Sequence, residues 1–441
     1  MRSLIFLLLQ TMAISGGSFL LWRLAKTGRA PKVFWLAAAT LSICLGVALF
    51  LFIQPGRIFD DFRPVYWAAG NAVLVAPDQL MPLLRIGVDG GFVNLPIVAY
   101  AFAPLGLLPA DFASWLFLVL GVGASLYAWW LAGSLFGFGR LERGISLLVL
   151  SGFGPLWYSL REGNSSHLLL VTLLLTIAAL RKNKDFRAGL LLGITGVIKP
   201  PLLLICVYAA VRLRWGIVLG AALVIGGCAV ASLAVFGLEA NLVWYQTNIG
   251  TFAREPIAAS NSHSIASVLA RLHHGADVLS SWTPVHVPPE VRLTGLVLTA
   301  LLALVAIYAA APWERWFVTA EEFEADIVLI VSLSLFASTL TWTHYYSWLL
   351  LPAAWLWAQI RAGGYPRAAE FTLGGTMLIC ALAYVRWSPP EIFDFLLPWL
   401  FTYLLLGGLV LFGMLVWARR RIAVAARKGG RNSVLDRLWA D

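Results

Sequence analysis

The chain has 441 residues, of which 60% are hydrophobic and only 12% are charged, whereas an ordinary soluble domain has about 25% charged residues. Its mean hydropathy is +0.82, and it contains 20 tryptophans and 25 phenylalanines. This composition excludes a soluble enzyme, a nucleic-acid-binding domain and a disordered protein. It predicts an all-α polytopic membrane protein.

The net charge of +10 indicates topology rather than an anionic partner. Seven basic residues fall within 418–441, and Arg419–Arg421 directly follow an apolar run. Such flanks are typical of the cytoplasmic side of a membrane, where anionic membrane lipids add some attraction. We therefore expect membrane lipids as partners and no nucleic acid. The four cysteines lie inside apolar runs without a short shared spacing, which favours neither a disulfide framework nor a zinc site.

Apolar runs of roughly 20 residues predict the membrane spans. The first run, 4–22, is expected to form an extra N-terminal helix, either a further span or an uncleaved signal anchor. A cleaved signal peptide is disfavoured because another apolar run follows at once. The further predicted spans are 33–54, 112–136, 144–160, 165–180, 215–236, 293–311, 327–341, 346–361, 369–386 and 393–417.

The apolar stretch 188–211 is interrupted at its middle by Lys199-Pro200-Pro201. Proline breaks a helix and disfavours helical geometry in the residue before it. A single span is possible, but it would place the basic loops on its two sides in opposite compartments. A hairpin of two half-length helices keeps every basic loop on one side, so the hairpin is the better interpretation.

The chain then has about 12–13 transmembrane helices and two long loops on the outer side, 55–111 and 237–292, which contain short helices. Both loops have few Lys or Arg for their length, as translocated loops do. We expect three parts: an N-terminal helix and cytoplasmic loop at 1–32, a transmembrane domain at 33–417, and a basic cytoplasmic tail at 418–441.

Two adjacent carboxylates, Asp60 and Asp61, open the first outer loop, followed by Arg63 and Tyr66. An ionisable group near membrane depth is costly and suggests function. Neighbouring residues on a helix point in different directions, so the two carboxylates do not form a symmetric pair. One is a candidate general base and the other a helix cap, and the residues alone do not say which. The alternative is that both carboxylates are ordinary loop residues without a role in function.

Lys199 lies between two apolar arms, where it either snorkels to the interface or binds an anion such as a lipid phosphate. Trp342 and His344 lie in a very short outer turn, where the His is a proton donor, a phosphate ligand or an interfacial filler. Another short turn carries Asn164, whose amide is suited to binding sugar hydroxyls.

The loop 237–292 holds Arg254 and four of the six histidines, His263 among them. Their spacing matches no metal-binding motif, so we predict no metal site. The chain also has no Walker A, GxGxxG or GxSxG sequence, so nothing supports nucleotide-driven or serine-hydrolase chemistry.

The ordered motifs resemble glycosyltransferase family 87, a family of polytopic GT-C enzymes. Asp61-Phe62 followed by Tyr66-Trp67-Ala68-Ala69 is similar to the family's "DF…YY-x-AA" element. The proline-spaced stretch 92–109, Gly163-Asn164, Ile198-Lys199-Pro200 and Thr341-Trp342-Thr343-His344 resemble further elements of the family in the correct order. The resemblance runs from about residue 55 to 355. It departs at Asn164, where the family has Gln, at Tyr345, where it has a second His, and at Ser262-His263-Ser264, a loose match to "NQS".

The resemblance implies an inverting glycosyltransferase of GT-C type on the outer, periplasmic face of the bacterial inner membrane. Its donor would be a polyprenyl-phosphate sugar, mannose or arabinofuranose, and its acceptor a hydroxyl of a lipid or glycan; no cofactor is implied. Asp61 matches the family's first-loop Asp and would be the base, with Asp60 beside it. The candidates for donor-phosphate binding are Lys199, His344, Arg63 and Arg254. The candidates for sugar or acceptor binding are Asn164, Tyr66, Trp342 and His263.

Two other functions remain as alternatives. A flippase or transporter of lipid-linked sugars would need charges at mid-membrane and repeat symmetry, whereas the polar residues here collect on one side. A polymerase or ligase of polyprenyl-linked glycans is the nearer rival, and consumption of a monophosphate donor would distinguish it from the transferase.

Overall fold

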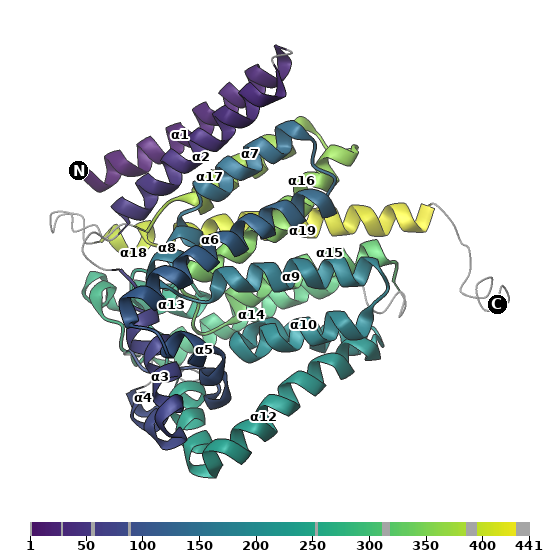
Figure 1. Cartoon of the computed structure of the whole chain (residues 1–441). Helices are drawn as coiled ribbons and strands as arrows, with labels where there is room; N and C mark the ends of the chain where they lie inside the picture. The colour runs from purple at the N-terminus through teal and green to yellow at the C-terminus, as the bar shows by residue number, and fades with distance from the viewer. Residues whose placement is uncertain are drawn as a thin grey trace.

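A computed structural model describes residues 2–27, 30–53, 58–86, 90–251, 255–310, 318–384 and 395–428. Within these ranges the regular secondary structure is helical, apart from two isolated β-bridges, Ile257 with Pro284 and Ser262 with Trp342. Figure 1 shows the long helices running side by side, while the short helices α3, α4, α5 and α13 gather at one end. The predicted all-α polytopic fold is confirmed.

The body is built from long helices and their shorter neighbours. They are α1 (Arg2–Lys26), α2 (Pro31–Phe52), α6 (Ala110–Leu135), α7 (Arg140–Ser151), α8 (Gly154–Glu162), α9 (Ser166–Arg181), α10 (Asp185–Ile198), α11 (Leu204–Val211), α12 (Trp215–Trp244), α14 (Pro289–Ala310), α15 (Ala320–Ala337), α16 (Leu350–Ala362), α17 (Arg367–Ala381) and α19 (Tyr403–Lys428).

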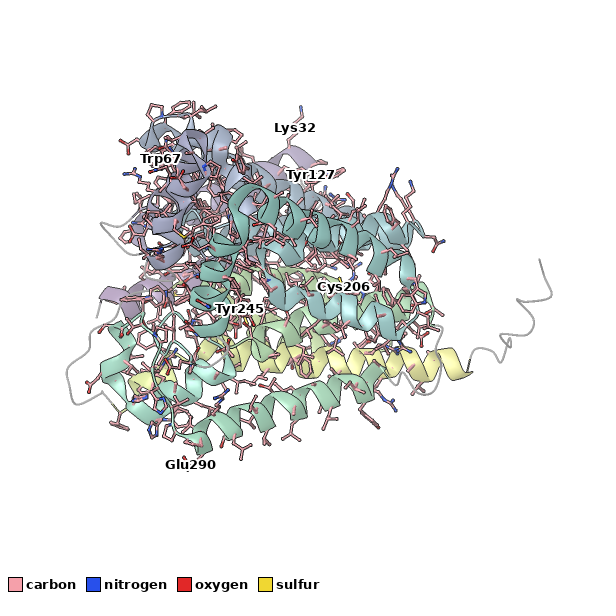
Figure 2. The ribbon with its side chains drawn as sticks, turned by 90° about the horizontal axis from the view of Figure 1, so that it is seen from below. Lys32, Trp67, Tyr127, Cys206, Tyr245 and Glu290 are labelled. Atoms are coloured by element: carbon pink, nitrogen blue, oxygen red, sulfur yellow. The ribbon has the colours of Figure 1, made fainter. Side chains whose placement is uncertain are left out.

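Six helices of the described chain are long and apolar enough to cross a membrane: α1, α2, α6, α12, α14 and α19. The pair α8 and α9, bent by 120°, makes a seventh if it is counted as one span. The outer surface of these helices is apolar, as lipid contact requires. Figure 2 shows Glu290, at the start of α14, at the margin of the body. Leu293, Leu296 and Leu301 of that helix are at least half exposed.

By length and composition the described helices give six or seven spans, fewer than the 12–13 predicted. The clearest differences in bounds are at two predicted spans. The span predicted at 144–160 is two helices, because Gly152 and Pro155 end α7 and begin α8. The span predicted at 327–341 begins earlier, at Ala320, so that α15 carries four acidic side chains in its first two turns. Three of these carboxylates (Glu322, Glu324 and Asp326) are buried against arginines, which a hydropathy pattern does not reveal.

The extra N-terminal helix is an integral part of the body. Gln10 of α1 is buried, and its amide donates to the carbonyl oxygens of Gly152 (2.8 Å) and Ala381 (2.5 Å). Its Oε1 accepts a bond from the Ala383 backbone N–H at 3.0 Å. One side chain thus satisfies backbone groups where both α7 and α17 end.

The stretch 188–211 is a hairpin, as the basic loops predicted. α10 runs to Ile198, Lys199 leaves helical geometry with φ −136° and ψ 87°, and η4 (Pro200–Leu203) leads into α11. The ion pair of Arg214 with Asp185 places the start of α12 beside the start of α10. Lys199, which follows the last residue of α10, therefore lies at the opposite end of the bundle from the starts of α10 and α12.

The predicted outer loops supply the short helices. The first contains η1 (Phe62–Trp67), α3 (Ala68–Val75), η2 (Pro77–Leu80), α4 (Met81–Ile86), η3 (Pro96–Val98) and α5 (Ala99–Gly106). The second contains η5 (Tyr245–Gly250), α13 (Ile265–His274) and η6 (Ala276–Ser280), and η7 (Thr343–Leu349) and α18 (Leu397–Leu400) lie nearby. We call the end of the molecule that carries these elements the site end.

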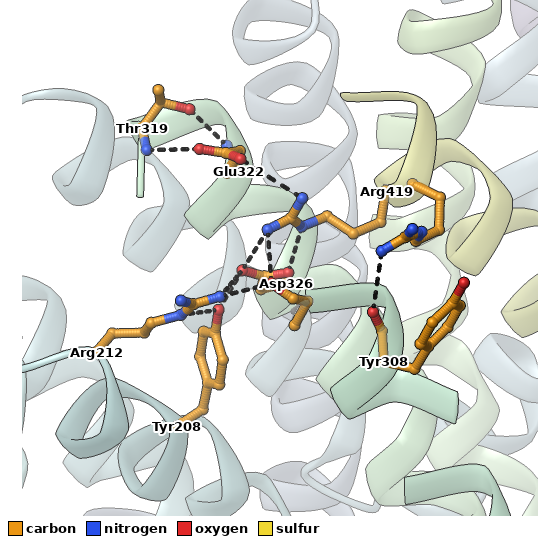
Figure 3. Close-up of polar contacts among 9 residues, drawn as sticks. Tyr208, Arg212, Tyr308, Thr319, Glu322, Asp326 and Arg419 are labelled. Atoms are coloured by element: carbon orange, nitrogen blue, oxygen red, sulfur yellow. Dashed lines mark hydrogen bonds and ion pairs between the residues drawn. The ribbon is translucent and has the colours of Figure 1, made fainter. Parts of the chain in front are cut away.

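The opposite end, which we call the paired end, holds buried and half-buried ion pairs between helices. Arg181 of α9 binds Glu324 of α15 through two hydrogen bonds of 2.7 and 2.6 Å, and Arg361 of α16 pairs with Glu142 of α7. Figure 3 shows the Asp326 carboxylate between the guanidinium groups of Arg212 and Arg419, with the Tyr208 hydroxyl alongside.

The network in Figure 3 joins four helices. Arg419 of α19 donates to Asp326 at 2.5 Å, and Arg212, after α11, donates to the last carbonyl of α14, that of Ala310, at 2.8 Å. Asp326 belongs to α15, whose N-terminus is closed by a capping box of Thr319 and Glu322. Arg419 was expected in a cytoplasmic tail at 418–441, but α19 continues past it and its side chain is buried.

Candidate active site

A cavity of about 660 Å³ opens at the site end. Its walls come from the start of η1, residues 90–95, the turn between α8 and α9, the break after α10, η5 and the 338–345 turn. The cavity brings together seven predicted site residues, which are Asp60, Asp61, Tyr66, Asn164, Lys199, Trp342 and His344. Segments almost 300 residues apart in the sequence thus meet at one cavity.

Asp61 is held in place by backbone pairing with the end of α8. The Phe59 N–H donates to the Arg161 carbonyl at 2.8 Å, and the Asp61 N–H donates to the Glu162 carbonyl at 3.0 Å. Gly163 follows with φ 71°, and a Cβ at this position would lie 2.4 Å from the Phe62 Cβ. Only glycine combines that conformation with so close an approach.

Asn164 positions the Asp61 carboxylate. Its Oδ1 accepts from the backbone N–H (3.1 Å) and hydroxyl (2.9 Å) of Ser166, so its Nδ2 must face the other way. Nδ2 donates to Asp61 Oδ2 at 2.8 Å and lies 3.4 Å from the Tyr66 hydroxyl. The amide predicted to bind sugar is therefore engaged with the candidate base.

The two carboxylates have different surroundings. Asp60 is exposed at the rim, whereas Asp61 is half-buried. Burial raises the pKa of Asp61 above its usual value, the Asn164 hydrogen bond and the Lys199 charge oppose that rise, and the Asp60 charge adds to it. A carboxylate with a raised pKa is a stronger base than an ordinary aspartate.

Lys199 is buried at the helix break, 4% exposed, and lines the cavity. Its ammonium donates to the Tyr345 hydroxyl at 2.9 Å and lies 4.2 Å from the centre of that ring. No carboxylate among the described residues forms an ion pair with it, so its charge is available to an anion in the cavity. Tyr345, where the family pattern has a second histidine, orients this lysine.

His344 is 4% exposed, and neither ring nitrogen has a hydrogen-bond partner within the described chain. Its ring stacks on Tyr158 with centroids 6.1 Å apart and planes 12° apart. Burial, followed by the Lys199 and His167 charges, lowers the pKa of His344 well below its usual range. The imidazole is therefore neutral before an anion enters, with one N–H to donate.

The remaining predicted residues are placed differently. His263 does not line the cavity; its backbone N–H donates to the Thr341 carbonyl at 2.7 Å and its ring bonds the Thr343 hydroxyl at 3.0 Å, which supports the turn that carries Trp342. Arg63 points away and pairs with Asp111 of α6 at 2.7 Å, both side chains being well exposed. Arg254 lies outside the described residues.

The residues that line the cavity and that the sequence did not single out include Asn94, Tyr158, Asn248, Asn261 and Trp282. Asn261 donates to the Tyr158 hydroxyl (2.9 Å) and accepts from the Trp282 indole N–H (3.1 Å), which links α8 to the segment after η6 across one wall. In the sequence, only their polar character could have marked these asparagines as site residues. They were missed because asparagines in loops ordinarily indicate turns.

The arrangement provides a basic carboxylate, a buried cation and a neutral imidazole around one cavity. No group of three His, Cys, Asp or Glu side chains in the described ranges is placed to hold a metal ion. The geometry suits removal of a proton at one point and stabilisation of an anion at another.

In a comparison with known families, the sequence model of glycosyltransferase family 87 matches residues 92–341, more than half of the chain. Asn94, Asn164, Lys199, Asn248 and Asn261 fall inside the matched region, whereas Asp60 and Asp61 precede it. Comparisons with curated proteins and with solved structures give no match.

Proposed function

The chain belongs to glycosyltransferase family 87 and is a membrane glycosyltransferase, and we propose that it transfers a sugar from a polyprenyl-phosphate donor to a hydroxyl group of a lipid or glycan. The observation that carries the proposal is the cavity in which Asp61 and Lys199 lie within electrostatic reach of one another. Mannose and arabinofuranose are the proposed sugars, following the family resemblance.

The reaction we propose is a single displacement. The acceptor oxygen attacks the anomeric carbon while Asp61 takes the hydroxyl proton, so a new C–O bond forms as the bond to the phosphate oxygen breaks. The leaving lipid phosphate departs with the bonding electrons, and its charge is stabilised by the Lys199 ammonium and a His344 N–H. A single displacement inverts the anomeric configuration.

The distribution of basic residues supports a cavity on the outer face of a bacterial inner membrane. Arg181, Arg212, Arg214 and Arg361 all lie at the paired end, and Arg419–Arg421 follow on the last helix. By the positive-inside rule that end is cytoplasmic, which would leave the cavity on the opposite side.

A flippase is the weaker alternative, because the cavity is confined to one end and the buried charges of the paired end are engaged with one another. A polymerase or ligase of polyprenyl-diphosphate glycans would use a similar cavity. It would leave a monophosphate donor unconsumed.

The test is transfer of radiolabelled sugar by the purified protein from synthetic polyprenyl-phosphate mannose, with a membrane lipid extract as acceptor. The same assay is run with polyprenyl-phosphate arabinofuranose. Asp61→Asn is expected to lower the rate by about 10²- to 10⁴-fold, the usual contribution of a general base. Asp60→Asn, the matched control at the adjacent exposed carboxylate, is expected to retain activity.

Equal activity of the wild type and Asp61→Asn would exclude Asp61 as the base. Absence of transfer from either donor would contradict the polyprenyl-monophosphate proposal and favour the alternatives.

A further inference from the structure

Four asparagines line the cavity, and they fall into two kinds. Asn164 and Asn261 use both ends of their amides on protein groups, so they fix the positions of Asp61 and Tyr158. Asn94 and Asn248 are 5% and 3% exposed, and each has a polar side-chain atom without a hydrogen-bond partner in the described ranges. A buried polar atom without a partner destabilises the fold unless a ligand or water satisfies it.

The orientation of Asn248 is fixed by its own helix. Its Nδ2 donates to the Trp244 carbonyl at 3.2 Å, and because a carbonyl only accepts, the unpartnered atom is the acceptor Oδ1. The residue belongs to η5, a π-helical turn, which is a geometry that occurs often at functional sites.

Asn94 lies on the adjoining segment and presents the opposite polarity. Its unpartnered atom is the donor Nδ2. The Trp244 indole donates to the carbonyl of Val93 at 3.0 Å, so the residue before Asn94 is tied to the helical turn that carries Asn248. One wall of the cavity thus offers an unused hydrogen-bond donor and an unused acceptor.

This pair of groups discriminates among the chemical parts of the expected substrates. A prenyl chain forms no hydrogen bond. A phosphate dianion accepts but does not donate, so it cannot satisfy Asn248 Oδ1. A hydroxyl group both donates and accepts, and a sugar carries several of them.

We propose that Asn94 and Asn248 form a sugar-hydroxyl subsite that selects the carbohydrate, a role that rests on the proposed function of this cavity. The sugar comes from either the donor or the acceptor, and the experiment separates these two sources.

The first arm measures the affinities of the purified protein for polyprenyl phosphate and for its mannose and arabinofuranose derivatives. The ratio of the affinities for a sugar derivative and for polyprenyl phosphate isolates the sugar's contribution. A donor-sugar subsite predicts that Asn94→Ala and Asn248→Ala each reduce this ratio by about 3- to 10-fold, as expected for a neutral hydrogen bond, while affinity for polyprenyl phosphate is unchanged. The unchanged affinity also shows that the variants are folded.

The second arm titrates the membrane lipid extract in the transfer assay. An acceptor-sugar subsite predicts that both variants raise the half-maximal extract concentration by a similar factor, with the donor affinity ratio unchanged. Asn241→Ala is the matched control, because Asn241 lies on α12, which continues directly into η5, and uses its amide on Ser232 and Gly237. It is expected to change neither quantity.

Two results would overturn the subsite. In one, both variants behave as the wild type in both arms, as they would if water alone satisfied the two amides. In the other, Asn241→Ala has the same effect as the two variants, which would indicate a general disturbance of α12. If the wild type fails to bind polyprenyl phosphate, the proposed donor is wrong and the subsite is abandoned with it.

Discussion

The two ends of the molecule bury the same kinds of charged side chain and use them differently. At the paired end, Asp326 contacts Arg212, Arg419 and the Tyr208 hydroxyl. At the site end, Asp61 accepts from the Asn164 amide and is influenced by Lys199 through space. Carboxylates saturated by guanidinium groups join helices, whereas a carboxylate with one neutral donor keeps its basicity. The difference lies in the partners of each charge rather than in its burial.

Disrupting the ion pairs of the paired end should lower the stability of the protein and leave its rate of sugar transfer nearly unchanged. Arg419→Met leaves Asp326 buried with one guanidinium fewer, and removal of one member of a buried pair typically costs about 3–5 kcal/mol. We expect a clearly lower midpoint of thermal unfolding in detergent, with transfer per folded molecule near the wild-type rate. Arg420→Met, at a half-buried position over the Tyr308 ring, is the control and should change little. Equal losses in both variants would contradict the network's structural role.

Removing the cation at the site end should have the opposite pattern. Lys199→Met eliminates the buried ammonium proposed to stabilise the leaving phosphate, so we expect transfer to fall by about 10²- to 10³-fold. The unfolding midpoint should hold or rise, because an unpaired buried charge is replaced by an apolar side chain. Lys182→Met, on the exposed loop after α9, is the control. Undiminished transfer by Lys199→Met would place the phosphate elsewhere.

A backbone change tests whether the position of Asp61 matters as much as its charge. Gly163→Ala introduces a Cβ 2.4 Å from that of Phe62 at a φ of 71°, so the turn that holds Asp61 must shift. We expect transfer to fall roughly 10- to 100-fold, as a displacement of about 1 Å can do. Gly374→Ala, where a Cβ meets nothing within 4 Å, should be silent. A fully active Gly163→Ala would show that the site tolerates movement.

The pH dependence of kcat/KM provides the smallest and most specific test. Asp61 must be ionised to act as a base, so activity should fall as the pH falls through its pKa. That decline should occur at a higher pH than for an ordinary aspartate, because burial raises the pKa of Asp61. Asp60→Asn removes a charge that raises the pKa further, so it should move the decline to lower pH by up to about one unit. A shift in the opposite direction would argue against Asp61 as the titrating group.

The sequence predicted the helices and part of the site for identifiable physical reasons. Asp61, Asn164, Lys199 and His344 each lie at a break in an apolar run, and such breaks on one side of a membrane protein share one face. Membrane spans were visible because lipid contact requires long apolar helices. The candidate site residues were therefore predicted from the polar side chains at these breaks.

The missed features depend on partners that are remote in sequence. The burial of Arg419 in an ion pair was not predicted, because its partner, Asp326, lies 93 residues away in another helix. Asn94 and Asn248 resembled ordinary turn residues, because an unpartnered amide is recognised only when the surrounding contacts are known. Arg63 was a reasonable phosphate ligand until its pairing with Asp111 was seen.

The bonds made by Gln10 have a consequence for how this protein is made. Its partners lie at Gly152 and at Ala381 and Ala383, so α1 completes these contacts only after the segments up to Ala383 have been inserted. Until then the side-chain amide of Gln10 lacks the backbone groups of α17 and of Ala383 as hydrogen-bond partners. The N-terminal helix and the end of α17 therefore close the bundle together, as a late step of assembly.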